Sequence, residues 1–172
     1  MSIQSHTLSY SARTAVFVSA LILFCLGGAH AQHGPGPFER MAGHWTGSGT
    51  IDLANGSREP LHCRASYDLL AQHRQLQLNI RCASDSYNFN LLGSAVLSGH
   101  SVSGSWSEST RSVSGNISGT AEGDRVAVRA DTIGFSANLS LITHGNHQTV
   151  SIRAVDPNSG IKGATIHLRR RG

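Results

Sequence analysis

The chain has few aromatic residues and none of the motifs that mark the common active sites. Aromatic side chains are 6% of its 172 residues, and no stripe of alternating basic and aromatic residues indicates a nucleic-acid surface. It lacks a Gly-x-Ser-x-Gly elbow, a Cys-x-x-Cys pair and a His-x-His pair beside carboxylates. The arginines are dispersed, which is typical of a solvated face. We therefore expect no catalytic residue, no metal site, no cofactor and no nucleic-acid partner.

The first 31 residues predict a secretory signal peptide. Arg13 supplies positive charge before the apolar run from Thr14 to Leu26, and Ala29-His30-Ala31 forms a small-x-small cleavage site. This apolar run is too short to span a bilayer, so no membrane span is expected after cleavage. The prediction is an exported protein, periplasmic or secreted, with residues 1–31 removed after Ala31.

Two of the three cysteines lie after the predicted cleavage site. Cys63 and Cys82 each belong to an alternating run of apolar residues that is typical of a half-buried strand. If the two cysteines face each other in an antiparallel hairpin, the same register places Tyr67 opposite Leu78. Because an oxidising compartment preserves disulfides, we predict a bond between Cys63 and Cys82.

Short alternating runs fill the rest of the chain, and no convincing helix interrupts them. A turn around Phe38 to Met41 precedes the runs, while Asn55-Gly56 and the segment His144 to His147 predict tight hairpins. The pattern predicts an all-β fold, a single antiparallel barrel of about 8–10 strands, with a β-sandwich as the alternative. The side chains predicted to be buried in it include Trp45, Tyr67, Leu78, Phe89, Trp106, Ile117, Phe135, Leu139, Ile152 and Ile166.

The chain that remains after cleavage is long enough for one hydrophobic core and short for two. We therefore predict residues 32–42 as an N-terminal segment and residues 43–172 as one barrel domain. Within it, Val96 is out of phase with Phe89, which predicts a bulge near Leu92-Gly93.

Several segments resemble known proteins. The run from Phe38 to Trp45 resembles the short turn and Gly-x-Trp that begin the first strand of lipocalins and other calycins. The segments 59–61, 81–87 and 104–108 resemble an uncharacterised group of small exported bacterial proteins. Calycins bind small hydrophobic molecules inside the barrel, so the resemblance implies a calycin-like barrel that acts as a binding module.

The lipocalin resemblance also implies a contact between the two ends of the barrel domain. In lipocalin-like barrels, a basic side chain of the last strand covers the tryptophan of Gly-x-Trp. Arg170 continues the inward phase of the last strand, so we expect it to stack on Trp45 while Arg169 faces water. In the alternative, the terminal arginines form a frayed, solvated tail.

The candidate ligand-binding residues are Trp45, Tyr67, Tyr87, Trp106 and Glu108. Glu108 is in phase with Trp106, so it is expected to point inward and to orient a polar group of the ligand. The alternative is that Glu108 is hydrated or pairs with Arg111.

Three functions stay open from the sequence. The favoured one is binding of a small apolar or amphipathic ligand inside the barrel. The second is a structural or protein-interaction component of the cell envelope, with no ligand cavity. The third is a small hydrolase or isomerase that uses Glu108, although we expect no enzyme activity.

Overall fold

The computed structural model describes residues 34–156 and 159–172. The predicted signal peptide, residues 1–31, lies outside these described residues. Within them, no helix is long and apolar enough to cross a membrane.

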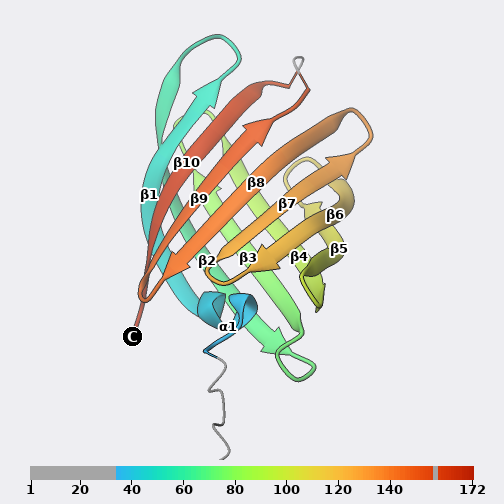
Figure 1. Ribbon diagram of the computed structural model, residues 1–172. Helices are drawn as coiled ribbons and strands as arrows, with labels where there is room; N and C mark the ends of the chain where they lie inside the picture. Colours follow the sequence, from blue (N-terminus) through green and yellow to red (C-terminus); the bar gives the residue numbers. More distant parts are fainter. Residues whose placement is uncertain (1–33, 157–158) are drawn as a thin grey trace, which may run out of the picture. The chain divides into compact units, whose positions relative to one another are not determined.

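Ten antiparallel strands close into one barrel after a single short helix (Figure 1). Each strand pairs with the next along the chain, and β1 pairs with β10 to complete the circle. This confirms the predicted all-β barrel and rejects the sandwich. The elements are α1 (Pro37–Met41), β1 (Gly43–Leu53), β2 (Arg58–Leu70), β3 (Gln75–Ala83), β4 (Asn88–Ser98), β5 (Ser101–Glu108), β6 (Val113–Glu122), β7 (Arg125–Thr132), β8 (Phe135–His144), β9 (His147–Ala154) and β10 (Ile161–Arg170).

The β2–β3 hairpin has the predicted register. Cys63 pairs with Cys82, and Tyr67 pairs with Leu78. The two cysteines form a disulfide that joins the strands. Both are buried, so the bond lies on the apolar face that the alternating pattern indicated.

Close contact between β1 and β10 explains two glycines of β1. A Cβ atom on Gly47 would lie 1.9 Å from the backbone oxygen of His167, and one on Gly49 would lie 2.0 Å from that of Thr165. No larger residue fits without moving the neighbouring strand. The glycines therefore allow the sheet to close on itself.

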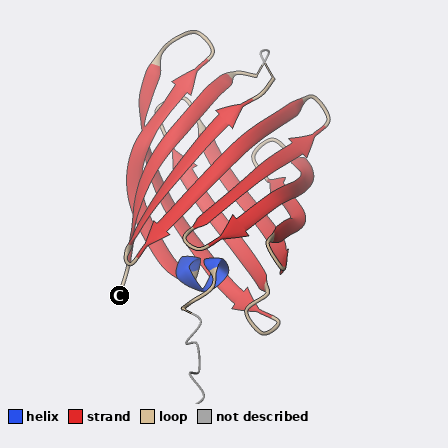
Figure 2. Cartoon of the chain, in the orientation of Figure 1, coloured by secondary structure: helices blue, strands red, loops and turns tan. Residues whose placement is uncertain are grey.

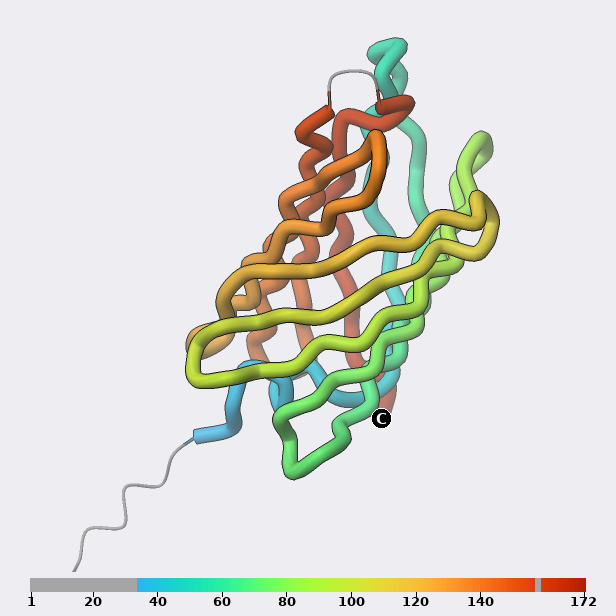
Figure 3. Tube along the Cα trace, turned by 90° about the vertical axis from the view of Figure 1, so that its right-hand side faces the viewer, coloured from blue at the N-terminus to red at the C-terminus, as the bar shows by residue number. Residues whose placement is uncertain are grey.

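Helix α1 closes one end of the barrel (Figure 2). Its Phe38 and Met41 are buried in the core, and the Trp45 indole Nε1 donates a hydrogen bond of 2.7 Å to the Met41 backbone oxygen. A further hydrogen bond joins His73, in the β2–β3 turn, to Glu39 of α1. Figure 3 shows α1 and this turn at the same end of the barrel.

Arg170 holds this closed end together. Its guanidinium carbon lies 4.5 Å from the centroid of the Trp45 ring, as the lipocalin resemblance implied. The same guanidinium donates hydrogen bonds to the backbone oxygens of Ala42 and Arg40, beside α1. Arg169 is exposed, so both parts of the expectation are confirmed.

The predicted bulge near Leu92-Gly93 is wrong. Strand β4 pairs with β3 and β5 without a break in register. Val96 lies on the outer face, where 45% of its surface is exposed, while Ala95 is buried inside. The phase inference failed because the small residue occupies the inner position and the larger apolar residue the outer one.

The disulfide predicts a stability difference. Replacing both Cys63 and Cys82 with serine should lower the free energy of unfolding by roughly 3 kcal/mol, because the bond closes a loop in the unfolded chain. Urea denaturation measures this loss, and a reductant should cause a similar loss in the wild type and none in the variant. Recovery of two free thiols by peptide mapping under non-reducing conditions would contradict the bond.

The contact between Arg170 and Trp45 predicts a measurable coupling. A double-mutant cycle with Arg170→Gln and Trp45→Leu should give a coupling free energy of about 0.5–2 kcal/mol. The cycle separates the ring contact from the hydrogen bonds that Arg170 makes to the backbone. Arg169→Gln, at the exposed neighbour, is the control and should change stability little. A coupling of zero would show that Arg170 acts without the ring.

Candidate functional site

The closed end of the barrel is packed, and three of its buried polar side chains are joined by hydrogen bonds, although the buried Nε atoms of Arg40 and Arg170 have no partner among the described residues. The Tyr67 hydroxyl donates a 2.9 Å hydrogen bond to Gln148, whose amide nitrogen donates one of 3.0 Å to the Thr143 hydroxyl. All three residues are buried, and burial raises the pKa of the Tyr67 hydroxyl. Two of the candidate ligand contacts, Trp45 and Tyr67, are each only 1% exposed. Both side chains therefore serve the closed end.

The opposite half of the barrel is more open. Many of its side chains have the inward phase of their strands, as predicted, yet solvent still reaches them. On β1 and β2 the wall is closed, because Ile51, Leu53 and Leu61 are buried. Four of the ten residues predicted to be buried belong to this partly exposed group, and Leu78 is also only partly buried, so the phase was right and the degree of packing was not. The partly exposed apolar residues of this open half are Ile80, Phe89, Leu91, Val113, Val128, Ala130, Phe135, Leu139, Ile152 and Ile161.

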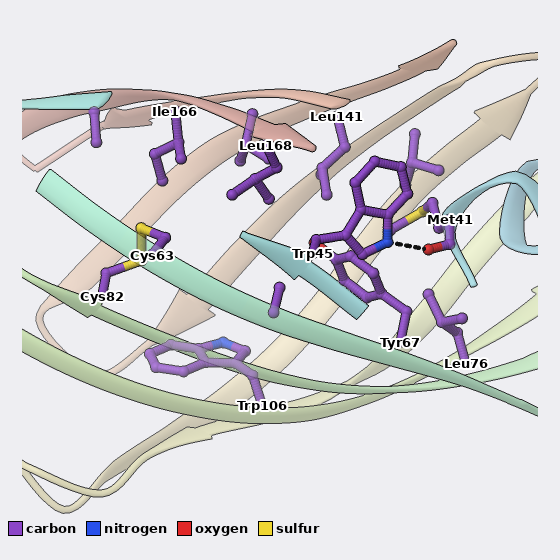
Figure 4. Packing of buried hydrophobic residues seen from close by; sticks show 14 of the residues in the cluster. Met41, Trp45, Cys63, Tyr67, Leu76, Cys82, Trp106, Leu141, Ile166 and Leu168 are labelled. Carbon is purple, nitrogen blue, oxygen red and sulfur yellow. Dashed lines mark hydrogen bonds between the residues drawn. A yellow bond between two sulfur atoms is a disulfide. The ribbon is translucent and has the colours of Figure 1, made fainter. Parts of the chain in front are cut away.

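Within the described part of the chain, Trp106 presents an unpartnered polar atom in this open half. Its cross-strand partners are Gly93 of β4 and Gly115 of β6, neither of which carries a side chain. The indole Nε1 is buried and has no hydrogen-bond partner among the described residues. Figure 4 shows the contrast with Trp45, whose Nε1 bonds to the backbone of α1. A buried donor without a partner costs roughly 1–3 kcal/mol, and a ligand acceptor would recover this cost.

Glu108 is buried and engaged with its own chain. Its Oε1 accepts hydrogen bonds from the backbone N–H groups of Asn90 and Thr110 and from the Thr110 hydroxyl, and its Oε2 accepts one from the Arg111 N–H. Burial raises the pKa of this carboxyl, but these hydrogen bonds outweigh burial and hold the pKa at about 2. Glu108 therefore anchors the β5–β6 turn. Its Oε2 lies 3.6 Å from Nη1 of Arg111, the partner named in the alternative prediction.

Tyr87 lies at the rim of the open half, in a cluster that joins the β3–β4, β5–β6 and β9–β10 connections. Its ring stacks on that of Phe89 with centroids 6.0 Å apart. The Arg111 guanidinium lies 5.3 Å from the centroid of each ring, and the Tyr87 hydroxyl donates a 3.3 Å hydrogen bond to the Gly160 oxygen. The structure thus brings Tyr87, Trp106 and Glu108 to the open half. The sequence offered only the Tyr-x-Phe spacing as a signal for this cluster.

Two grooves hollow the outer face of the barrel. The larger, of about 900 Å³, crosses β2 to β6 and is lined mainly by serine, asparagine and glutamine side chains. The smaller, of about 800 Å³, crosses β1 to β4 and includes arginines. Within the part of the chain that the structure describes, no three His, Cys, Asp or Glu side chains come together as a metal site.

The low pKa of Glu108 predicts a pH-dependent contribution to stability. A carboxylate whose pKa is lowered by folding stabilises the protein at pH values above the ordinary pKa of the group, 4.5. This contribution to stability is lost as the pH falls toward the lowered pKa of about 2. Glu108→Gln should therefore be less stable than the wild type at pH 7, and the difference should shrink across this range. Urea denaturation at several pH values measures it.

Other carboxyls also add to the acid sensitivity of the wild type. The backbone N–H of Gly36 lowers the pKa of Glu39, and hydrogen bonds from Ser86 and Ser84 lower that of Glu59. These groups are unchanged in Glu108→Gln, so the difference between the two proteins isolates Glu108. A difference that stays constant with pH would contradict its lowered pKa.

Comparison with known proteins shows the fold and no closer relationship. No family model matches the chain, and no curated protein matches it significantly. The crystal structure of Rv2717c from M. tuberculosis is similar with a TM-score of 0.62 at 12% identity, over 77% of this chain and 94% of that one. The S-type phycobiliprotein lyase CPES from Guillardia theta is similar with a TM-score of 0.52 at 12% identity, over 78% of this chain and 90% of that one. Both are calycin-like barrels, which agrees with the fold implied by the Gly-x-Trp segment.

Proposed function

We propose that the protein binds a small apolar or amphipathic ligand in the open half of its barrel. The observation that carries this proposal is the buried Nε1 of Trp106, which has no partner among the described residues. Around it, the inward-facing apolar side chains keep partial solvent exposure. An apolar wall with one unused polar group is the composition typical of a small-molecule site.

The same residues define the chemistry of the ligand. Its body is apolar, because the open half presents aliphatic and phenyl side chains. It carries one hydrogen-bond acceptor, such as a carbonyl or hydroxyl oxygen, that faces the Trp106 N–H. The inward-facing carboxylate of Glu108 already accepts hydrogen bonds from Asn90, Thr110 and Arg111, so the ligand needs no cation to neutralise it.

Export is part of this proposal. The signal-peptide pattern of residues 1–31 supports a periplasmic or secreted protein. The Cys63–Cys82 disulfide supports the same location, because such bonds persist in oxidising compartments. A ligand held there would be carried or sequestered outside the cytoplasm.

Titration with Nile red, a neutral apolar dye with a carbonyl acceptor, tests the site. The wild type should bind the dye saturably with a blue shift of its emission. Ala130→Phe, which places a ring on the inner face of β7, should abolish binding. Ala127→Phe places the same ring on the outer face of β7 and is the matched control. Trp106→Phe should weaken binding by about 2- to 10-fold, because it removes one neutral hydrogen bond between the indole N–H and the dye.

Val113→Phe, on the inner face of β6, is a second filling variant in case Ala130→Phe unfolds, and thermal unfolding establishes that each variant is folded. Dye binding that survives both inner-face variants would place the dye outside the barrel and would contradict the proposal. Absence of dye binding by the wild type, together with a bare polypeptide mass in native mass spectrometry of protein from its own host, would instead favour a barrel without a ligand.

A further inference from the structure

A row of arginines crosses the outer face where the barrel closes. The register places Arg169 of β10 beside Thr46 of β1, Thr46 beside Arg64 of β2, and Arg64 beside Arg81 of β3. The three arginines are exposed. Neighbouring strands lie about 4.8 Å apart, so the row concentrates positive charge on a short stretch of surface.

The outer groove of about 800 Å³ lies over Thr46, Arg64 and Arg81 of this row, and Arg169 is not part of its lining. Arg64, Arg81 and Arg171 line it together with His62, and its lining contains no Asp or Glu. Arg171 extends from the end of β10 and donates a weak hydrogen bond of 3.4 Å from its Nε to the Thr46 hydroxyl. The groove is therefore a hollow with three guanidinium groups and no opposing charge.

The two opposed arginines of the groove have no carboxylate partner among the described residues. Neither Arg64 nor Arg81 forms an ion pair there, as is true of most arginines in this part of the chain, whereas Arg58, Arg111 and Arg129 each pair with a carboxylate. Like charges placed directly opposite on neighbouring strands destabilise a sheet. A bound anion would remove this repulsion.

The disulfide lies directly beneath the opposed arginines. Cys63 and Cys82 form the next cross-strand pair to Arg64 and Arg81 and also line the groove. The bond fixes the two strands against the repulsion of the two guanidinium groups. It thereby fixes the backbone positions from which the two guanidinium groups extend.

We propose that this groove binds a compact soluble anion that carries more than one phosphate group. The planar guanidinium fork matches phosphate oxygens with two parallel hydrogen bonds, and three such groups suit several oxyanions. The hollow shape favours a small molecule over a flat membrane surface. Because the groove lies on the outer face, this site is separate from the ligand site proposed inside the barrel.

Isothermal titration calorimetry with inorganic pyrophosphate tests the site on the purified protein. The wild type should bind pyrophosphate, and the double variant Arg64→Gln/Arg81→Gln should bind it at least about tenfold more weakly, since two charge-assisted contacts are lost. The control is Arg125→Gln/Arg153→Gln, which removes the same charge from exposed positions on β7 and β9. It should change the affinity by less than about twofold.

Three results would overturn the proposal. They are no pyrophosphate binding by the wild type, an equal loss in the control, and binding only to vesicles that contain anionic phospholipid. The last result would show a membrane-binding surface instead of a site for a soluble anion. Because each glutamine replaces an exposed side chain, thermal unfolding should show that both double variants are folded, and Arg64→Gln/Arg81→Gln should be at least as stable as the wild type because it removes the repulsion.

Discussion

The closure of the sheet between β1 and β10 is the constraint on which the rest of the structure depends. It gives the chain an inside and an outside, and it removes the free edges along which sheets aggregate. Closure requires the glycines at positions 47 and 49, because backbone oxygens of β10 lie where a Cβ atom would be. Arg170 then joins the end of β10 to α1 and to Trp45.

Closure makes the two halves of the interior unequal. At the α1 end, Trp45, Tyr67 and Gln148 have hydrogen-bond partners and exclude water. At the other end, the Trp106 Nε1 has no partner among the described residues, and the apolar wall is partly exposed. We infer that the packed closed end helps to hold the barrel together while part of the wall at the other end stays free to bind. Glu108 maintains the open end by holding the β5–β6 turn through backbone hydrogen bonds.

Alternation of residues predicted the faces of the strands well, because each side chain of a strand points opposite to the next. The disulfide then gave the register of β2 and β3, and the Gly-x-Trp resemblance gave the contact between Arg170 and Trp45. Alternation does not report how tightly a face is packed, so Phe135 and Ile152 were placed inward correctly but are only partly buried. The sequence indicates only a solvated face for these arginines, because Arg64 and Arg169 become near neighbours only when the barrel closes.

The central claim is that the open half, and not the closed end, receives a ligand. Two-dimensional ¹H–¹⁵N NMR tests it directly, because the two tryptophans give separate indole N–H signals that Trp106→Phe assigns. On addition of 1-decanol, an apolar chain with one hydroxyl oxygen, the Trp106 indole signal should shift as its N–H gains an acceptor. The Trp45 signal should stay in place, since its N–H already bonds to Met41. A shift of Trp45 alone, or of neither signal, would contradict the account.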